Sequence, residues 1–257
     1  MKVVLLAGGK GTRITEESEY KPKPLIEIGG MPILWHIMKQ YSYYGFNEFI
    51  ICVGYKQEMI KAWFADYFMR TSDITFDFTK NGLMQTHHSR TEKWKVTIVD
   101  TGIDTMTGGR VKRVQEYIHE DNFMMTYGDG VCNLNLQNLL DFHMNHGKIA
   151  TLTSVVLKQD KGILDIGWDN SVRAFREKQN INERTINAGY MVFSKKIFDY
   201  LESDETILER KPMEQLADEG ELMSYRHNGF WKCMDTLLEK QQLEHMWNMG
   251  IAPWKKW

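Results

Sequence analysis

The sequence predicts an α/β protein with a Rossmann-like central sheet, mixed but mostly parallel, flanked by helices and carrying a small antiparallel β insertion. Three observations lead to this prediction. Short apolar runs alternate along the chain with segments of helical periodicity, as in a sheet covered by helices. The first run, 3–7, is too short and too β-branched for a lone helix and indicates a buried parallel strand. Between 75 and 99, apolar and polar residues alternate, which is typical of exposed antiparallel strands.

The elements before the insertion follow from residue spacing. Pro32 suits the first turn of a helix because its φ is already fixed near the helical value. The apolar residues after it share one helical face: Leu34, Ile37, Met38 and Tyr41. The apolar run 48–53 indicates the next buried strand. Residues 57–69 show helical spacing again, so we expect a second helix there.

The alternation resumes after the insertion. Gly147 follows the apolar stripe of 136–146 and is suited to end a helix there. By the same kind of spacing, we expect further helices at 109–118, 196–201, 213–218 and 237–249. Short apolar runs predict strands at 122–127, 149–157, 163–167, 172–175 and 188–193. No internal repeat interrupts the pattern, so we expect one domain over 1–257.

Composition disfavours several classes of protein. The 257 residues are enough to bury one large core, and the formal net charge of -2 argues against a nucleic-acid-binding surface, which needs a basic excess. The three cysteines are odd in number and far apart, so they fit neither a disulfide framework nor a zinc site. No apolar run approaches the ~20 residues that span a bilayer, and the N-terminus lacks a secretory signal. We therefore expect a soluble cytoplasmic protein.

The segment after the first strand has the chemistry of a polyphosphate site. Gly8, Gly9 and Gly11 lack the Cβ atoms that would keep a ligand away, so backbone N–H groups can point at phosphate oxygens. Arg13 adds a fixed cationic fork, and Lys23 is held between two prolines. The spacing differs from the Gly-x-Gly-x-x-Gly of dinucleotide-binding folds and from a P-loop. A purely structural turn would need neither cation.

Two carboxylates are candidate metal ligands. Asp129 lies between two glycines at the carboxyl end of the strand 122–127, where α/β sheets place their ligands, although it could equally be a turn-forming residue. Asp235 precedes the last helix, where an N-cap is the simpler interpretation. Together with a triphosphate the two would suit Mg²⁺, which takes oxygen ligands. Their spacing in the sequence does not show whether they meet.

Three further features have competing interpretations. The pair Glu177-Lys178 is either a solvated turn or a site for sugar hydroxyls and a phosphate. The run Gly108-Gly109-Arg110 is either a glycine turn before a helix or a second place of close backbone approach beside a cation. Four histidines lack partners that would complete a zinc set, and we assign no role to them: His87, His88, His143 and His146.

With these residues in place, the chain resembles the sugar-phosphate nucleotidyltransferases over nearly its whole length. The general motif is the glycine loop ending in Gly11-Thr12-Arg13, followed by Pro22-Lys23-Pro24. Later runs resemble the members that transfer a cytidylyl group from CTP to glucose 1-phosphate, and these runs are 27–30, 33–39, 106–110, 126–131 and 252–255. The resemblance implies the nucleotide-diphospho-sugar transferase fold. It divides the chain into a nucleotide-binding part of about 1–130, a sugar-phosphate-binding part of about 131–235 and a C-terminal helix of about 236–257.

The resemblance also implies a role for each matching residue. Arg13, Lys23 and Asp129 would be the catalytic residues, and Asp129 and Asp235 would hold Mg²⁺ as the cofactor. The nucleotide would be bound by Leu6, Ala7, Gly8, Gly9, Gly11, Thr12, Arg13, Lys23, Thr107, Gly108, Gly109, Arg110 and Gly128. The sugar phosphate would be bound by Tyr127, Glu177, Lys178, Asn187 and Gly189.

The chain departs from the family pattern on the sugar side. It has Gln179 where the family usually has proline after Glu-Lys, and it has Asp160-Lys161-Gly162 where Arg-Phe-Gly is common. The sequence therefore constrains the nucleotide chemistry more closely than the identity of the sugar.

The implied reaction needs no general base. A phosphomonoester has a second pKa of about 6, so the sugar phosphate is anionic at neutral pH. Its oxygen can attack the α-phosphorus of CTP in line and expel pyrophosphate. Catalysis then needs positioning and positive charge, which Arg13, Lys23 and Mg²⁺ would supply.

Several alternatives to this function stay open. One is a transferase of the same fold that uses UTP, dTTP or another sugar phosphate. Another is a nicotinamide-dependent oxidoreductase, which the glycine spacing disfavours, and a third is a catalytically silent nucleotide-binding regulator. For partners, we expect CTP and glucose 1-phosphate but neither nucleic acid nor a membrane. The resemblance suggests a homo-oligomer, with a hexamer as one candidate and 75–99 as an interface, and a product used for O-antigen or dideoxyhexose synthesis.

Overall fold

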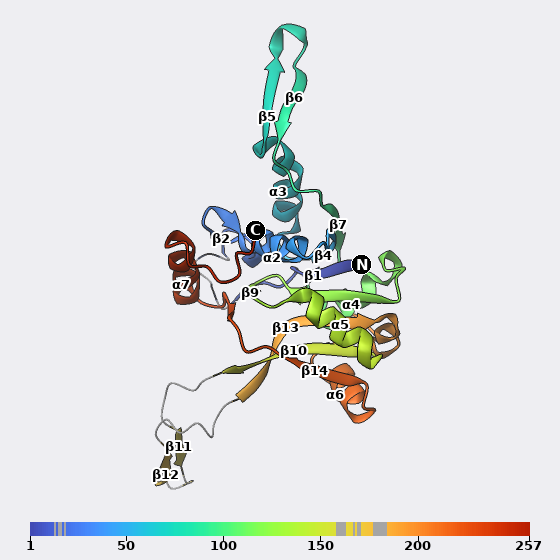
Figure 1. Ribbon diagram of the computed structural model, residues 1–257, viewed down its shortest axis with the longest axis vertical. Coiled ribbons are helices and arrows are strands. Elements are labelled where there is room, and N and C mark those ends of the chain that lie inside the picture. The colour runs from blue at the N-terminus through green and yellow to red at the C-terminus, as the bar shows by residue number, and fades with distance from the viewer. Residues whose placement is uncertain are drawn as a thin grey trace.

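The protein is built around a central β-sheet. Its structure is a computed structural model, which describes residues 1–12, 14, 17, 19–157, 163–166, 168, 171–176 and 184–257. Within that part of the chain, seven strands form one sheet in the order β14-β10-β13-β8-β1-β4-β7 (Figure 1). The strands are β1 (Lys2–Leu6), β4 (Glu48–Val53), β7 (Lys95–Asp100), β8 (Asn122–Tyr127), β10 (Ala150–Leu157), β13 (Arg184–Ser194) and β14 (Leu222–Arg226). The helices are α2 (Ile33–Tyr43), α3 (Gln57–Arg70), α4 (Thr107–Arg113), α5 (Leu136–His146), α6 (Lys211–Asp218) and α7 (Leu237–Asn248). The prediction of a mixed, mostly parallel α/β fold is confirmed.

Strand β1 is buried on both faces because its side chains alternate between two cores. Val3 and Leu5 belong to the core that includes α2, α5 and the C-terminal Trp254. Val4 and Leu6 belong to the core that includes residues of α4 and α6. Full burial of each such side chain contributes about 1.5–3 kcal/mol, so a continuous apolar run is what this position requires.

The strand order creates a switch point beside β1. Strand β1 pairs in parallel with β4 on one side and with β8 on the other, and β7 follows β4 in parallel. The chain therefore builds outward through β4 and β7 and then returns to the far side of β1. Strand β13 is antiparallel to both of its neighbours, β8 and β10. In open α/β sheets, ligands bind where the strand order reverses, so the carboxyl ends of β1 and β8 define the expected site.

The predicted antiparallel insertion at 75–99 is only partly correct. Strands β5 (Ser72–Asp77) and β6 (Leu83–Ser89) do pair as an antiparallel hairpin, which projects from the body of the molecule (Figure 1). Strand β7, however, joins the central sheet in parallel with β4. An edge strand with half-buried side chains shows the same apolar and polar alternation as an exposed antiparallel strand, so periodicity alone could not separate them.

Other elements differ in type or extent from their predictions. The expected helix 109–118 is the shorter α4 followed by a 3₁₀ turn at Gln115–Tyr117, and the expected helix 196–201 is a 3₁₀ helix at Lys195–Tyr200. Strands β11 (Ile163–Ile166) and β12 (Val172–Arg176) pair with each other, as their runs suggested. The sequence did not predict β2 (Glu27–Ile28), β3 (Met31–Pro32), β9 (Gly130–Cys132), β14 or β15 (Trp231–Cys233). Across the described residues, no helix combines the length and apolar character needed to cross a membrane.

Candidate active site

A cavity of about 610 Å³ opens at the switch point of the sheet. Its walls are the loop after β1, the 3₁₀ helix Lys23–Leu25, the loop before α4 and the turn after β8. Twelve of the residues predicted for the site line it: Leu6, Ala7, Gly8, Gly9, Gly11, Thr12, Lys23, Thr107, Arg110, Tyr127, Gly128 and Asp129. Arg13, Glu177 and Lys178 lie outside the described residues, as do Gln179 and 160–162.

The glycine loop needs glycine for two different reasons. A Cβ on Gly8 would lie 2.1 Å from Nη1 of Arg110, so no side chain fits there. Gly11 has a φ of +64°, a left-handed conformation that favours glycine. A Cβ on Gly9 would have no heavy atom within 4 Å, so its backbone borders open space. The loop can therefore bring its backbone close to a ligand, and binding of a polyphosphate there stays a prediction.

Arg110 stabilises the loops around the cavity through hydrogen bonds to their backbone. Arg110 is 5% exposed, and its guanidinium group donates hydrogen bonds to the carbonyl oxygens of Gly8 at 3.1 Å and Gly102 at 2.7 Å and to Thr101 Oγ1 at 2.7 Å. Further bonds reach the carbonyl oxygens of Val53 and Ile103. Burial lowers the pKa of this guanidinium. The side chain thus ties together the loops that follow β1, β4 and β7, and its role in nucleotide binding stays a prediction.

Gly108 and Gly109 have a packing reason in this structure. A Cβ on Gly108 would lie 2.8 Å from the Thr206 carbonyl oxygen, and one on Gly109 would lie 2.6 Å from Asp204. The N–H groups of both glycines donate to the Thr206 carbonyl oxygen at 2.9 and 3.2 Å. The start of α4 therefore packs directly against the backbone of Asp204 and Thr206. Neither glycine lines the cavity, whereas Thr107 does.

Lys23 lies between the two carboxylates that the sequence singled out. Its Nζ is 2.6 Å from Asp129 Oδ2 and 2.6 Å from Asp235 Oδ1. The Lys23 side chain is 8% exposed and each aspartate side chain is 22% exposed. Burial by itself would lower the pKa of Lys23, but the charge and hydrogen bond of Asp129, followed by those of Asp235, raise it. The ammonium group is therefore charged at neutral pH.

A small two-stranded sheet brings the distant aspartates together. Strand β15 pairs with β9 so that Cys233 is opposite Gly130, and the N–H of Met234 donates to the Asp129 carbonyl oxygen at 2.9 Å. Asp235 is the second residue after this strand, and its N–H donates to Glu239 of α7 at 2.8 Å. Glu239 also completes a capping box with Thr236. Strand pairing and helix cap together fix the place of Asp235.

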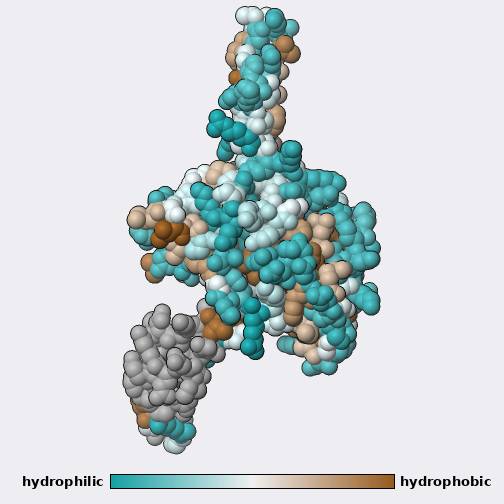
Figure 2. Space-filling view, viewed as in Figure 1, coloured by the Kyte–Doolittle hydropathy of each residue, from teal (hydrophilic) through white to brown (hydrophobic). Residues whose placement is uncertain are grey.

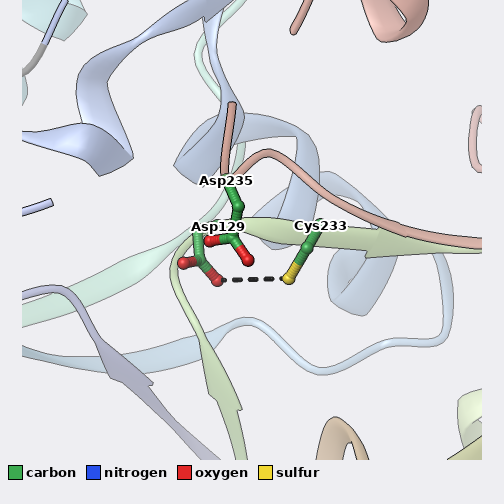
Figure 3. A group of neighbouring side chains, drawn as sticks. All are labelled: Asp129, Cys233 and Asp235. Atoms are coloured by element: carbon green, nitrogen blue, oxygen red, sulfur yellow. Dashed lines mark hydrogen bonds between the residues drawn. The ribbon is translucent and has the colours of Figure 1, made fainter. Parts of the chain in front are cut away.

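The donors at this point fit a divalent cation. One ligand atom each from Asp129, Cys233 and Asp235 lie within 4.8 Å of one another (Figure 3). Carboxylate oxygens suit Mg²⁺, and the ammonium group between them shows that the position stabilises positive charge. Sequence reasoning missed Cys233. The signal was its place two residues before Asp235 in an extended segment, which puts both side chains on one face.

The residues predicted for the sugar phosphate lie beside β8 and β13. Gly189 has a φ of +84°, and a Cβ there would lie 2.4 Å from the Tyr127 ring. Asn187 Oδ1 accepts a hydrogen bond from the Gly189 N–H at 2.8 Å. The Tyr127 hydroxyl donates to Glu209, which also accepts from Thr107 Oγ1 at 2.6 Å. Glu209 is a neighbour that sequence reasoning missed, because it comes from a loop far along the chain.

Three of the histidines without an assigned role form hydrogen bonds with threonine hydroxyl groups. His143 Nδ1 lies 2.8 Å from Thr151 Oγ1, and His146 Nε2 lies 2.7 Å from the same oxygen. Burial lowers the pKa of His143 to about 4. His87 Nε2 lies 2.9 Å from Thr75 Oγ1 on the projecting hairpin. These histidines lie away from the residues that line the cavity.

The chain is similar to known proteins in both sequence and fold. The model of a family described as nucleotidyl transferase matches residues 2–236. A protein of Salmonella typhi named glucose-1-phosphate cytidylyltransferase is 51% identical over 258 residues, covering 100% of both chains. A Bacillus subtilis protein named as a probable glucose-1-phosphate cytidylyltransferase is 44% identical, again over 100% of both chains. Among solved structures, HddC from Yersinia pseudotuberculosis in complex with GMP-PN has a TM-score of 0.69 at 22% identity, covering 96% of this chain and 99% of the other.

Proposed function

We propose a reaction for this chain, which belongs to the nucleotidyl transferase family: the transfer of CMP from CTP to α-D-glucose 1-phosphate, giving CDP-glucose and pyrophosphate. Full-length identity of 51% to the Salmonella typhi protein supports both substrates. The observation that carries the proposal is the position of Lys23. Lys23 lines the glycine-lined cavity at the switch point of the sheet, and its ammonium group lies between two carboxylates.

The chain's own residues would act by holding and neutralising the phosphates. Backbone N–H groups of Gly8 to Thr12 would bind the triphosphate, because glycine lets the loop approach it closely. Lys23 would place its charge on the oxygens of the α-phosphate as the fifth bond forms, and Arg13 would do so from the same loop. The sugar phosphate is already anionic, so no residue needs to remove a proton.

Asp129 and Asp235 are the residues that would hold Mg²⁺. When bound, the ion would neutralise charge on the phosphates of the nucleotide. The proximity of the two carboxylates to each other and to Lys23 supports this assignment. For the sugar phosphate, we propose the polar groups of Tyr127, Asn187 and the backbone at Gly189. Glu177 and Lys178, which lie outside the described residues, stay predicted contacts of the same substrate.

We also propose that the protein assembles with copies of itself through the β5–β6 hairpin. Four large apolar side chains are exposed on it: Phe76 at 50%, Phe78 at 84%, Leu83 at 58% and Met84 at 47%. Apolar residues are visible on this projection in the space-filling view (Figure 2). An isolated hairpin is marginally stable in water, and cover from a second copy would bury these residues. The three unpaired cysteines support a reducing compartment such as the cytoplasm.

The proposal is tested by measuring pyrophosphate release over a grid of nucleoside triphosphates and sugar 1-phosphates with Mg²⁺. We expect release that depends on both substrates and is fastest with CTP and glucose 1-phosphate. Faster release with UTP or dTTP, or with another sugar, would replace the proposed substrates but keep the reaction class. No release with any pair would contradict the proposal and favour a binding protein without activity.

A further inference from the structure

Glu209 connects two side chains that line the candidate active site. Its carboxylate accepts hydrogen bonds from Thr107 Oγ1 at 2.6 Å and from the Tyr127 hydroxyl. Thr107 is the first residue of α4, Tyr127 is the last residue of β8, and both line the cavity. Glu209 itself is not among the described residues that line the cavity. Its effect on a ligand would therefore pass through these two hydroxyl groups.

The hydrogen bonds fix the direction in which each hydroxyl acts. A carboxylate accepts hydrogen bonds and donates none, so both hydroxyl protons are directed at Glu209. Thr107 Oγ1 also accepts a hydrogen bond from the Leu208 N–H at 3.0 Å. A hydroxyl has one proton and two lone pairs. Each of the two oxygens therefore keeps a lone pair for a ligand but has no proton left to donate to it.

The surrounding structure holds this arrangement in place. Leu208, the residue before Glu209, is fully buried, and its bond to Thr107 holds the segment against the start of α4. The Tyr127 ring packs on Gly189, where a Cβ would lie 2.4 Å from it. The two hydroxyl groups are thus fixed, and so is the carboxylate that receives their protons.

The surroundings of the two hydroxyl groups differ. Thr107 follows a loop with two exposed apolar side chains that line the cavity, Ile103 at 55% and Met106 at 46% exposed. Apolar side chains of a pocket cover the flat part of a ligand, and the few polar groups beside them fix its orientation. Tyr127 instead lies two residues before Asp129, where the reacting phosphates are proposed to bind. A nucleotide base would therefore lie beside Thr107 rather than beside Tyr127.

We propose that Glu209 is a positioning residue that makes Thr107 recognise the nucleotide base as a hydrogen-bond acceptor. Cytosine carries an amino group, which donates, at the position where uracil and thymine carry a carbonyl oxygen, which accepts. Thr107 Oγ1 accepts a hydrogen bond from the amino group, whereas its lone pair repels the carbonyl oxygen. The inference rests on the proposed function and extends it from the reaction to the choice of base.

The test is the ratio of the dissociation constants for UTP and CTP, measured by calorimetric titration of the full-length protein with Mg²⁺ and without sugar phosphate. We expect the unchanged protein to bind CTP about tenfold more tightly, or better. Glu209→Ala frees the Thr107 proton to turn toward the base, so the hydroxyl can also donate to a carbonyl oxygen. The preference for CTP should then fall by roughly tenfold.

Glu219→Ala is the matched control for this variant. Glu219 also accepts a hydrogen bond from a tyrosine hydroxyl, that of Tyr200 at 2.5 Å, and neither residue is among the described residues that line the cavity. Its ratio should stay within about twofold of that of the unchanged protein.

Two further variants separate this role from a general loosening of the cavity wall. Thr107→Val removes the hydroxyl and should lower the preference for CTP by a similar factor. Adding Glu209→Ala to it should lower the preference no further, because Glu209 acts through Thr107. Tyr127→Phe keeps the bond between Thr107 and Glu209 and should leave the ratio within about twofold.

The inference is overturned if the unchanged protein binds UTP as tightly as CTP, if Glu209→Ala keeps the preference, or if the two losses multiply in the double variant. Pyrophosphate release is measured separately. Release with the preference intact in Glu209→Ala contradicts this inference and leaves the reaction standing. Loss of the preference in that variant, in a protein that releases no pyrophosphate, refutes the reaction and leaves the role of Glu209 standing.

Discussion

At the scale of single residues, Lys23 contributes most to the account. Its place between Pro22 and Pro24 made it a candidate in the sequence, and the structure puts its ammonium group within 2.6 Å of both Asp129 and Asp235. The sequence could not show this contact, since the aspartates come from a different part of the chain. Arg110 differs from Lys23 in this respect. Its charge made it a predicted nucleotide-binding residue, but in the structure its guanidinium group donates hydrogen bonds to loop carbonyl oxygens.

Replacing Lys23 tests its proposed catalytic role. Lys23→Met should lower kcat by roughly 10²- to 10³-fold, because the charge on the transition-state oxygens is lost. Lys21→Met is the matched control, since Lys21 pairs with the exposed Glu27 and does not line the cavity. Its turnover should stay within about twofold of the unchanged protein. Both are measured by pyrophosphate release with thermal melts as a check on folding. Near-normal turnover in Lys23→Met would refute the role.

His36 makes stability depend on pH. Burial lowers the pKa of His36 to about 4, below its usual value of 6.5, and only its neutral form can accept a hydrogen bond from Trp254. The folded pKa is depressed, so the unfolded chain binds more protons between these values and stability falls as pH drops through this window. Between pH 7.5 and 5 this histidine should cost about 2 kcal/mol.

The variant His36→Gln should remove that part of the pH dependence. Gln can still donate to the Ile28 carbonyl oxygen, which lies 2.7 Å from His36 Nε2. Urea unfolding at pH 7.5 and pH 5 gives the free energies of unfolding of both proteins. An equal loss of stability in the variant and the unchanged protein would show that other groups cause the acid sensitivity.

At the scale of elements, local signals predicted well what the chain does locally. Gly147 ends α5 with a φ of +64°, as the sequence predicted. The β9–β15 pairing was not predictable, because each strand is three residues long and its partner is far along the chain. That pairing brings Asp129 and Asp235, which are far apart in the sequence, to the same position beside Lys23.

The cap of α7 connects helix stability to the proposed metal site. Thr236 follows Asp235, and its side chain caps the start of α7. Thr236→Ala removes this cap and should lower the free energy of unfolding by about 1 kcal/mol. It should also raise the Mg²⁺ concentration needed for half-maximal activity, because Asp235 is held less firmly. Ser194→Ala is the control, since Ser194 caps the 3₁₀ helix Lys195–Tyr200 away from the cavity. If both variants need the same Mg²⁺ as the unchanged protein, the cap does not position Asp235.

At the scale of the whole molecule, the alternation of strands and helices was enough to predict the mostly parallel sheet. It was not enough to place β7, whose half-buried face resembles that of an exposed strand, or β14, which joins β10 at the far edge. The sheet order itself depends on pairings between distant segments. It decides where the cavity lies, because the carboxyl ends of β1 and β8 meet only in the folded chain.

The projecting hairpin tests the proposed assembly. The double variant Phe76→Ser and Phe78→Ser removes exposed apolar surface, so it should shift an oligomer toward smaller species in sedimentation velocity. Ile251→Ser is the control, because Ile251 is 63% exposed but lies near the C-terminus, outside the hairpin. An unchanged sedimentation profile in the double variant would exclude the hairpin as the interface.

The central claim is that an oxygen of the sugar phosphate attacks the α-phosphorus of CTP. It is tested most directly with glucose 1-phosphate that carries ¹⁸O in its non-bridging phosphate oxygens, followed by mass spectrometry of the products. The account predicts that CDP-glucose retains all of the label and that the pyrophosphate carries none. Label in pyrophosphate or in free phosphate, or the absence of labelled CDP-glucose, would contradict it.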